Sequence, residues 1–204
     1  MVPAARGRST HAATTGGHVR DFGIALLASL GVVAQLAVVG LLIAALAAAV
    51  SPAARRAIAP AAATLGEWGA WMAAGVAAVA VAGSLWFSND AGFIPCHLCW
   101  LQREVMYPLA FLLVAVAIVR RWWLTLAAAV LPLIGAGISA RHVWVEAHPD
   151  DESAACRVGV PCSVKWIDEF GYITIPVLAG TAFVLVALLL VASGLVQRRQ
   201  GAPR

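Results

Sequence analysis

Residues 172–196 read YITIPVLAGTAFVLVALLLVASGLV, and this run without a charged side chain decides the fold class. A helix needs about 20 apolar residues to cross the hydrocarbon core of a bilayer. The whole chain has the same character, because 62% of its 204 residues are hydrophobic and only 12% are charged, with a mean hydropathy of +0.87. Soluble domains of this size are far more polar. The sequence therefore predicts an integral membrane protein.

Several further segments of the chain share this apolar character. Helices are expected in them, because a helix satisfies its own backbone hydrogen bonds inside lipid. The predicted fold class is an all-α membrane protein, a four-helix transmembrane bundle with an additional N-terminal transmembrane helix. The five apolar segments lie at residues 22–50, 67–87, 100–119, 122–144 and 172–196. The predicted organisation is a tail (1–21), the extra helix (22–50), a connector (51–66), the bundle (67–196) and a cytoplasmic tail (197–204).

Pairs of arginines flank the hydrophobic segments and predict the orientation. Such residues resist translocation, so the face that carries them is expected in the cytoplasm. The N-terminal arginines then lie outside, against the same rule, unless residues 22–50 form a hairpin or a surface helix. These pairs also explain the net charge of +4, and no basic patch predicts nucleic-acid binding. The pairs are Arg55/Arg56, Arg120/Arg121 and Arg198/Arg199.

All four cysteines fall on the face opposite the arginine pairs. Cys96 and Cys99 form a Cys-x-x-Cys just before the third hydrophobic segment, where a helix N-terminus would stabilise a thiolate. Cys156 and Cys162 lie in a longer acidic loop. Two pairs in series predict a relay, in which a mobile loop dithiol carries electrons between a soluble thiol protein and the pair at the membrane edge.

Two other interpretations of the cysteines stay open on the residues alone. Four cysteines can bind zinc, or they can close structural disulfides that staple loops. The second pair is not a Cys-x-x-Cys, and an oxidising compartment favours disulfides over thiolate ligands, so no metal is predicted. The acidic residues of the long loop are interpreted as a solvated, flexible surface without chemistry.

Charged and polar residues near the first cysteine pair are candidates for binding a quinone. Arg103 follows Cys99 by one helical turn, so it lies on the same helix face just inside the span. A charged side chain inside the membrane usually has a function, and the guanidinium beside a thiolate is suited to stabilise a reduced quinone oxygen. The alternative is that the side chain extends to the lipid headgroups. Gln102 and Glu104 either support Arg103 or are merely interfacial. His142 is predicted to assist quinone protonation or to anchor the span at the interface.

Three stretches of this sequence resemble a known family. They are PCHLCWLQREVMYPL at 95–109, VPCS at 160–163 and FGYITIP at 170–176. Together they resemble the signature of the DsbB family of disulfide bond formation proteins, and most of all its Gram-positive BdbC branch. The resemblance covers about residues 67–196 and does not extend to the extra N-terminal segment.

The resemblance implies roles for particular residues. Cys99 would contact the quinone, with Cys96 as its disulfide partner and Arg103 as the orienting cation. Cys156 would form a mixed disulfide with the soluble partner, and Cys162 would resolve it.

The resemblance also implies a cofactor, a partner and a location. These are menaquinone or ubiquinone, a DsbA-like (BdbD-like) thioredoxin-fold protein, and the bacterial plasma membrane with the cysteines on its extracytoplasmic side. A vitamin K epoxide reductase homologue is an alternative, but in that family the loop pair precedes the membrane pair. A non-catalytic membrane scaffold with structural disulfides is the alternative from another class.

Overall fold

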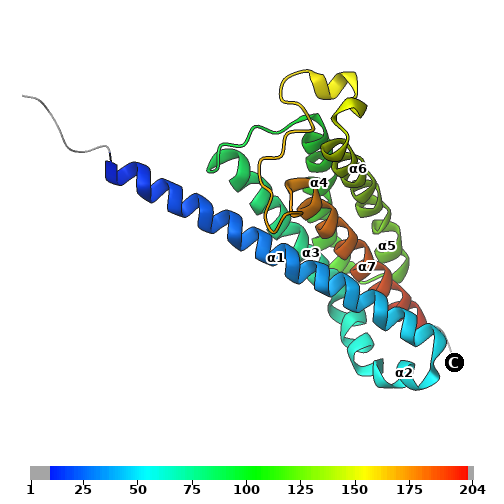
Figure 1. Cartoon of the computed structure of the whole chain (residues 1–204). Coiled ribbons are helices and arrows are strands. Elements are labelled where there is room, and N and C mark those ends of the chain that lie inside the picture. The colour runs from blue at the N-terminus through cyan, green and yellow to red at the C-terminus, as the bar shows by residue number, and fades with distance from the viewer. Residues whose placement is uncertain (1–9, 202–204) are drawn as a thin grey trace, which may run out of the picture.

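The computed structural model describes residues 10–201, and the regular elements within that range are helices (Figure 1). Five of the helical rods are long and apolar enough to cross a membrane, which confirms the predicted fold class. The fourth rod consists of two helices, α5 and α6, that follow one another almost without a break. The rods are α1 (Thr10–Val50), α3 (Ala59–Asn89), α4 (His97–Val119), α5 (Trp122–Ala128) with α6 (Val130–Ala147), and α7 (Ile175–Gly201).

The helices extend beyond the apolar segments that the sequence marks. Within the predicted tail 1–21, residues 1–9 lie outside the described residues, and α1 already begins at Thr10. The predicted connector 51–66 contains α2 (Pro52–Ala57) and the first turns of α3. The Ser51 side chain caps α2 by accepting a hydrogen bond from the Ala54 backbone at 3.2 Å. Short helical stretches thus replace an irregular linker.

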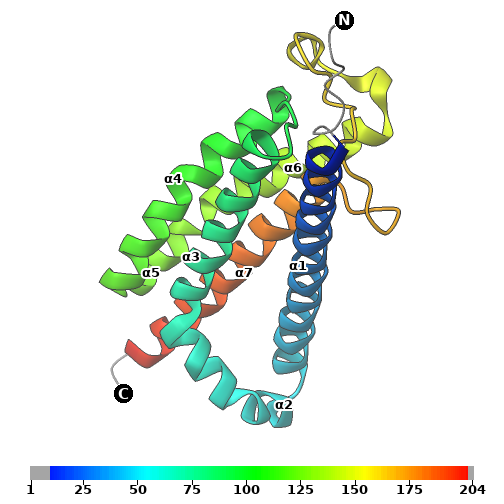
Figure 2. The same ribbon diagram turned by 90° about the vertical axis from the view of Figure 1, so that its left-hand side faces the viewer.

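The two ends of the bundle carry different kinds of residues. Helix α2 and the end of α7 lie at one end, and the cysteine-bearing loops lie at the other (Figures 1 and 2). The Arg198 guanidinium lies 5.4 Å from the centre of the Trp122 ring, so the turn between α4 and α5 lies beside the end of α7. The structure therefore gathers arginines at the end away from the cysteines.

Small residues let the bundle helices approach closely. A Cβ atom on Gly69 of α3 would lie 2.8 Å from the Ser193 side chain of α7. A Cβ atom on Gly135 of α6 would lie 2.3 Å from the ring of Phe183, which is fully buried in α7. Tight packing through small residues is the usual way in which helices associate in lipid. The close-packed bundle holds the loops at the cysteine end in place.

Helix α1 lies across the outside of this bundle. Figure 1 shows it crossing α3 and α7, and its residues Ile24 and Ala28 are buried against them. At Gly31 the backbone comes so close to α7 that a Cβ would lie 2.3 Å from Leu178. The Tyr172 hydroxyl donates a hydrogen bond to Gln35 Oε1 at 2.8 Å. The extra helix is thus docked by both packing and polar contacts.

Candidate functional site

The first cysteine pair sits at the beginning of α4. Cys96 is the N-cap residue, and its sulfur accepts a hydrogen bond from the Cys99 backbone N–H at 3.4 Å. The two sulfur atoms lie 3.0 Å apart as free thiols. Cys96 is buried, while Cys99 is partly exposed. The predicted placement of this pair at a helix N-terminus agrees with these positions.

The second pair packs directly on the first. Cys156 and Cys162 are joined by a disulfide, with their Cα atoms 5.3 Å apart. Cys156 lies in the short 3-10 helix η2 (Ala154–Arg157), which follows the similar turn η1 (Pro149–Asp151). Both bonded cysteines form one buried cluster with Cys96 and Val145. The loop disulfide therefore lies against the first cysteine of the pair on α4.

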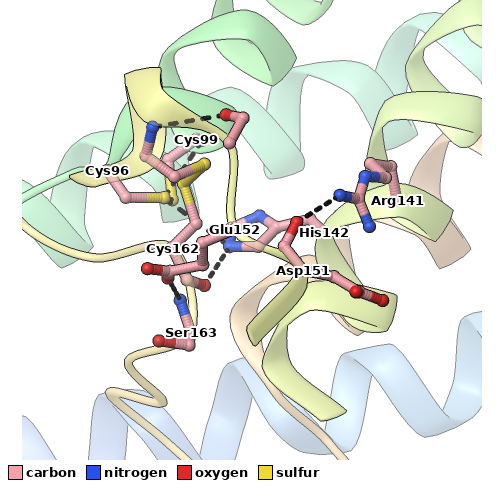
Figure 3. The surroundings of a disulfide bond; sticks show 10 residues. Cys96, Cys99, Arg141, His142, Asp151, Glu152, Cys162 and Ser163 are labelled. Atoms are coloured by element: carbon pink, nitrogen blue, oxygen red, sulfur yellow. Dashed lines mark hydrogen bonds between the residues drawn. A yellow bond between two sulfur atoms is a disulfide. The ribbon is translucent and has the colours of Figure 1, made fainter. Parts of the chain in front are cut away.

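His142 links the two pairs (Figure 3). Its Nε2 atom lies 3.6 Å from the Cys96 sulfur and 3.1 Å from the Cys162 carbonyl oxygen. The side chain is only 2% exposed, so it does not anchor the protein at the membrane surface. His142 comes from α6 and thus ties that helix to both cysteine segments.

The surroundings of Cys96 favour its thiolate. Cys96 precedes the membrane span, and a hydrogen bond from the Cys99 thiol is the main reason that its pKa is lowered. Burial acts in the opposite direction, and the hydrogen bond and charge of His142 lower the pKa further. A thiol with a low pKa is a good leaving group in disulfide exchange. Cys96 is therefore suited to be released from a disulfide with the loop.

Arg103 is fixed to a neighbouring helix. Its Nε atom donates to Ser84 Oγ at 2.9 Å, and its Nη2 atom donates to the Ser84 carbonyl oxygen at 2.8 Å and to Ser88 Oγ. The guanidinium also lies 5.2 Å from the centre of the Trp100 ring. It bonds to α3 rather than to the exposed Glu104. These contacts hold the charge in place beside Cys99.

Other polar residues near the pair have structural partners that the sequence did not identify. Gln102 is buried and donates to Ser139 Oγ at 3.0 Å, joining α4 to α6. Ser84 and Ser88, which hold Arg103, belong to no sequence motif. Their spacing of four residues places both on one face of an otherwise apolar helix, and that spacing is the signal that could have identified them.

A cavity of about 410 Å³ opens on the other side of Cys99. Cys99 and Arg103 lie at its polar end, and the rest of its lining is mostly apolar. An apolar pocket of a few hundred Å³ with a few convergent polar groups is typical of sites for small organic molecules. A quinone ring fits this chemistry, since the guanidinium can face a quinone oxygen next to the sulfur. His142 does not line this cavity and lies on the sulfur side instead.

The first cysteine pair and His142 together offer three possible ligands for a metal ion. The ligand atoms of Cys96, Cys99 and His142 lie within 4.8 Å of one another. Cys156 and Cys162 are bonded to each other, so they do not complete a four-thiolate zinc site. The short distances among these three residues are also what a dithiol redox pair with a supporting histidine requires.

The acidic loop is more ordered than the sequence suggests. Glu152 Oε1 accepts a hydrogen bond from the Ser163 backbone N–H at 2.6 Å, which ties the two sides of the disulfide loop together. The Asp151 carbonyl oxygen accepts from Arg141 Nη2 at 2.6 Å, and its carboxylate accepts from Trp144 Nε1 at 2.7 Å. Asp151 is exposed, as expected of a solvated loop, and Glu152 is half-buried; both also fasten the loop, to α6 and to itself.

Fold and site together define a multi-pass helical membrane protein with two cysteine pairs packed at one end. Residues 66–193 match the family model described as disulfide bond formation protein DsbB. The chain belongs to the DsbB family of disulfide bond formation proteins, and within it resembles the BdbC proteins of bacilli. This assignment sets aside the interpretation as a vitamin K epoxide reductase homologue.

Curated relatives agree with this assignment. The chain is 42% identical over 119 residues to disulfide bond formation protein C of Bacillus subtilis (strain 168), covering 55% of this chain and 83% of the relative. It is 36% identical over 126 residues to a probable disulfide formation protein of Oceanobacillus iheyensis, covering 60% and 84%. It is 40% identical over 119 residues to probable disulfide formation protein C of Halalkalibacterium halodurans, covering 58% and 85%. No solved structure matches the chain with significance.

Proposed function

We propose that this protein oxidises the dithiol of a DsbA-like thioredoxin-fold partner and passes the electrons to a membrane quinone. The observation that carries the proposal is the contact between the two cysteine pairs. The loop disulfide packs on Cys96 in one buried cluster, and Cys99 opens onto an apolar cavity that also holds Arg103. One pair therefore faces the loop, and a sulfur of the other pair faces a site suited to a quinone.

The proposed exchange moves two electrons in three steps. The partner's dithiol reduces the Cys156–Cys162 disulfide, through a mixed disulfide at Cys156 that Cys162 resolves. In the reduced loop, the Cys162 thiolate attacks Cys96 of an oxidised Cys96–Cys99 pair, and Cys99 leaves as a thiolate. Cys156 then attacks Cys162 and releases Cys96, so the loop disulfide is restored and the membrane pair is left reduced.

Each residue around the sulfurs has a role in this exchange. The lowered pKa of Cys96 makes it the better leaving group in the last step, and His142 stabilises its negative charge. A bound menaquinone or ubiquinone would accept two electrons and two protons from the reduced pair, so that the Cys96–Cys99 disulfide forms again and the quinol leaves. Arg103, held by Ser84 and Ser88, places a positive charge beside Cys99 where negative charge develops.

The loop must open for the partner to react. Cys156 is 2% exposed and Cys162 is fully buried, so a partner thiol cannot reach either sulfur while the loop is closed. The cysteine end is proposed to face the extracytoplasmic side of the bacterial membrane, because the arginine pairs cluster at the other end.

The experiment that tests this function measures quinone reduction by the purified protein, supplied with a reduced DsbA-like partner and a soluble quinone. Cys99→Ser and Cys156→Ser should each abolish quinone reduction, because each breaks one of the two pairs. Ser29→Ala, on the exposed face of α1, serves as the control and should retain it. If the wild-type protein reduces no quinone while its cysteines stay inert, the chain is a scaffold with structural disulfides instead.

A further inference from the structure

Helix α1 contributes much of the wall of the cavity beside Cys99. One face of α1 supplies apolar residues over almost three turns, and residues of α3 and α7 line the opposite side of the cavity. Three of these residues are small. Gly31 lets Leu178 of α7 approach closely, and Ala34 and Ala37 present short side chains to the cavity. The contributing residues of α1 are Leu27, Leu30, Gly31, Val33, Ala34 and Ala37.

This wall lies outside the part of the chain that defines the family. The family model begins at residue 66, after α1 has ended at Val50. In the Bacillus subtilis relative, the match covers 83% of the protein with 119 residues, so the uncovered remainder is shorter than the 41 residues of α1. The α1 part of the wall therefore comes from outside the region that matches the family.

The position of α1 on the bundle is specific. A Cβ on Gly83 of α3 would lie 3.1 Å from Leu27, and a Cβ on Gly23 of α1 would lie 2.3 Å from the Trp86 ring. Gln35 accepts from the Tyr172 hydroxyl at 2.8 Å and donates to Thr181 Oγ1 at 3.4 Å. Contacts of this kind fix both the depth and the rotation of α1, so the same residues face the cavity.

The cavity is elongated along α1 and α3. On α3 its lining runs from Ser88, beside Arg103, to Gly75, a length of about 20 Å at 1.5 Å per residue. Arg103 and Ser88 lie near the Cys99 end, whereas Val76, Val79 and Ala37 line the far part, where Thr181 is a polar exception. A quinone ring occupies only a few ångströms of such a length. The far part suits a flexible apolar chain attached to the ring.

We propose that α1 forms the binding site for the prenyl tail of the quinone, and so makes this protein selective for prenylated quinones. The proposal rests on the function given above, in which the ring lies beside Cys99. Inside the span the tail would otherwise contact lipid chains, so van der Waals packing against α1, α3 and α7 would hold it in the channel. The short side chains of Ala34 and Ala37 set the width of the channel on the α1 side.

The test compares a prenylated quinone with a quinone of the same ring without a tail. The measured quantity is the ratio of the two kcat/KM values in the full-length protein, since a loss of folded protein changes both values equally. Ala37→Trp should lower the preference for the prenylated quinone about tenfold, a loss of about 1.4 kcal/mol. Ala45→Trp, at an exposed alanine of the same helix that does not line the cavity, is the matched control and should leave the ratio unchanged.

A second measurement does not depend on any substitution. A prenylated quinone with a photoreactive group on its tail should label the segment from Leu27 to Ala37 of the wild-type protein, and unlabelled prenylated quinone should compete. Labelling confined to α4, α5 and α6 would overturn the proposal, and so would an unchanged ratio in Ala37→Trp. If a lipid acyl chain occupies the channel, competition by the quinone fails, which also overturns it.

Failure of the underlying function gives a different result. In that case the wild-type protein reduces neither quinone, so no ratio can be formed. A protein that reduces both quinones equally well, with or without Ala37→Trp, retains the proposed function and loses only the role of α1.

Discussion

The two sides of Cys99 are built in different ways. On one side lie buried sulfurs and a histidine, in residues that come from the matched region 66–193. On the other side lies an apolar cavity whose wall is partly α1, a helix outside that region. In the proposed function, the exchange of electrons would depend on a few polar groups at short distances, whereas the choice of quinone would depend on the shape of a long apolar surface.

The largest expected effect concerns the sulfur side. In the double variant Cys99→Ser/Cys156→Ser, we expect the two remaining cysteines, Cys96 and Cys162, to form a disulfide, and quinone reduction to be lost. The reason is that Cys96 and Cys162 belong to one buried cluster and both contact His142. Peptide mapping by mass spectrometry under non-reducing conditions measures the bond.

The matched control for this disulfide-forming variant is Cys96→Ser/Cys156→Ser, in which Cys99 and Cys162 are the two remaining cysteines. Cys99 faces the cavity with Arg103, so this variant should contain mostly free thiols. Equal yields of disulfide in the two variants would show that the sulfur and cavity sides of Cys99 are not distinct.

The next largest effect concerns Arg103, which lies beside Cys99 where the cavity begins. Arg103→Leu should lower kcat/KM for the quinone by about 10- to 100-fold, because a hydrogen bond to a charged group contributes about 1.5–3 kcal/mol. The double variant Ser84→Ala/Ser88→Ala keeps the charge and the bond to the residue-84 carbonyl but removes two side-chain hydrogen bonds to α3, so it should lose less. Steady-state kinetics with varied quinone concentration measure both.

Arg103→Lys distinguishes charge from geometry. Lysine keeps the positive charge but cannot reproduce the hydrogen bonds of the guanidinium to Ser84 and Ser88. We expect a loss between those of the serine double variant and of Arg103→Leu. Full activity in Arg103→Leu would mean that the quinone does not bind beside this residue.

Much of the fold could be predicted from the sequence, because the requirement to cross lipid acts on each segment separately. Apolar runs marked all five spans, and the structure differs mainly at their ends. Helix α3 begins at Ala59 and not at 67, since the alanines before residue 67 favour a helix wherever they lie relative to the lipid. Hydropathy detects the part of a helix that lies in lipid and does not detect its extensions.

The site could be predicted only where its residues are close in sequence. Cys96, Cys99 and Arg103 follow from spacing along one helix. The position of His142 between the two pairs depends on how α6 packs against the loop, and no local pattern encodes it. The contribution of α1 to the cavity depends on docking between segments more than 40 residues apart, such as Leu27 and Gly83. Such contacts arise from tertiary packing.

A smaller effect concerns the pH dependence of Cys96. Its pKa is lowered, so the thiolate persists as the pH falls below the usual thiol pKa of about 8.5. In the reduced protein, the rate of Cys96 alkylation by iodoacetamide should therefore change little from pH 8 to pH 6, whereas an ordinary thiol loses about tenfold per unit. Quantifying the alkylated peptide by mass spectrometry measures the rate.

His142→Phe should make this rate fall more steeply as the pH decreases, because the variant removes a hydrogen bond and a charge that lower the Cys96 pKa. The change should be partial, since the hydrogen bond from Cys99 is the larger cause. His97→Phe, at an exposed histidine next to Cys96 in sequence, is the control. Identical profiles for the two variants would show that His142 does not act on the sulfur.

The smallest expected effect concerns the opening of the loop. Glu152→Gln should speed reduction of the Cys156–Cys162 disulfide by a small-molecule reductant about three- to tenfold, because a neutral amide accepts the Ser163 N–H bond less strongly than a carboxylate does. Labelling of the released thiols over time measures the rate.

The control is Asp150→Asn, at an exposed acid in the same loop, which removes one negative charge without touching this bond. Equal rates in both variants would mean that loop charge alone controls access. A faster rate in Glu152→Gln alone would show that the loop opens by releasing Ser163. Opening of the loop would then control how the partner reaches the sulfurs, and the cavity would control only how the quinone binds.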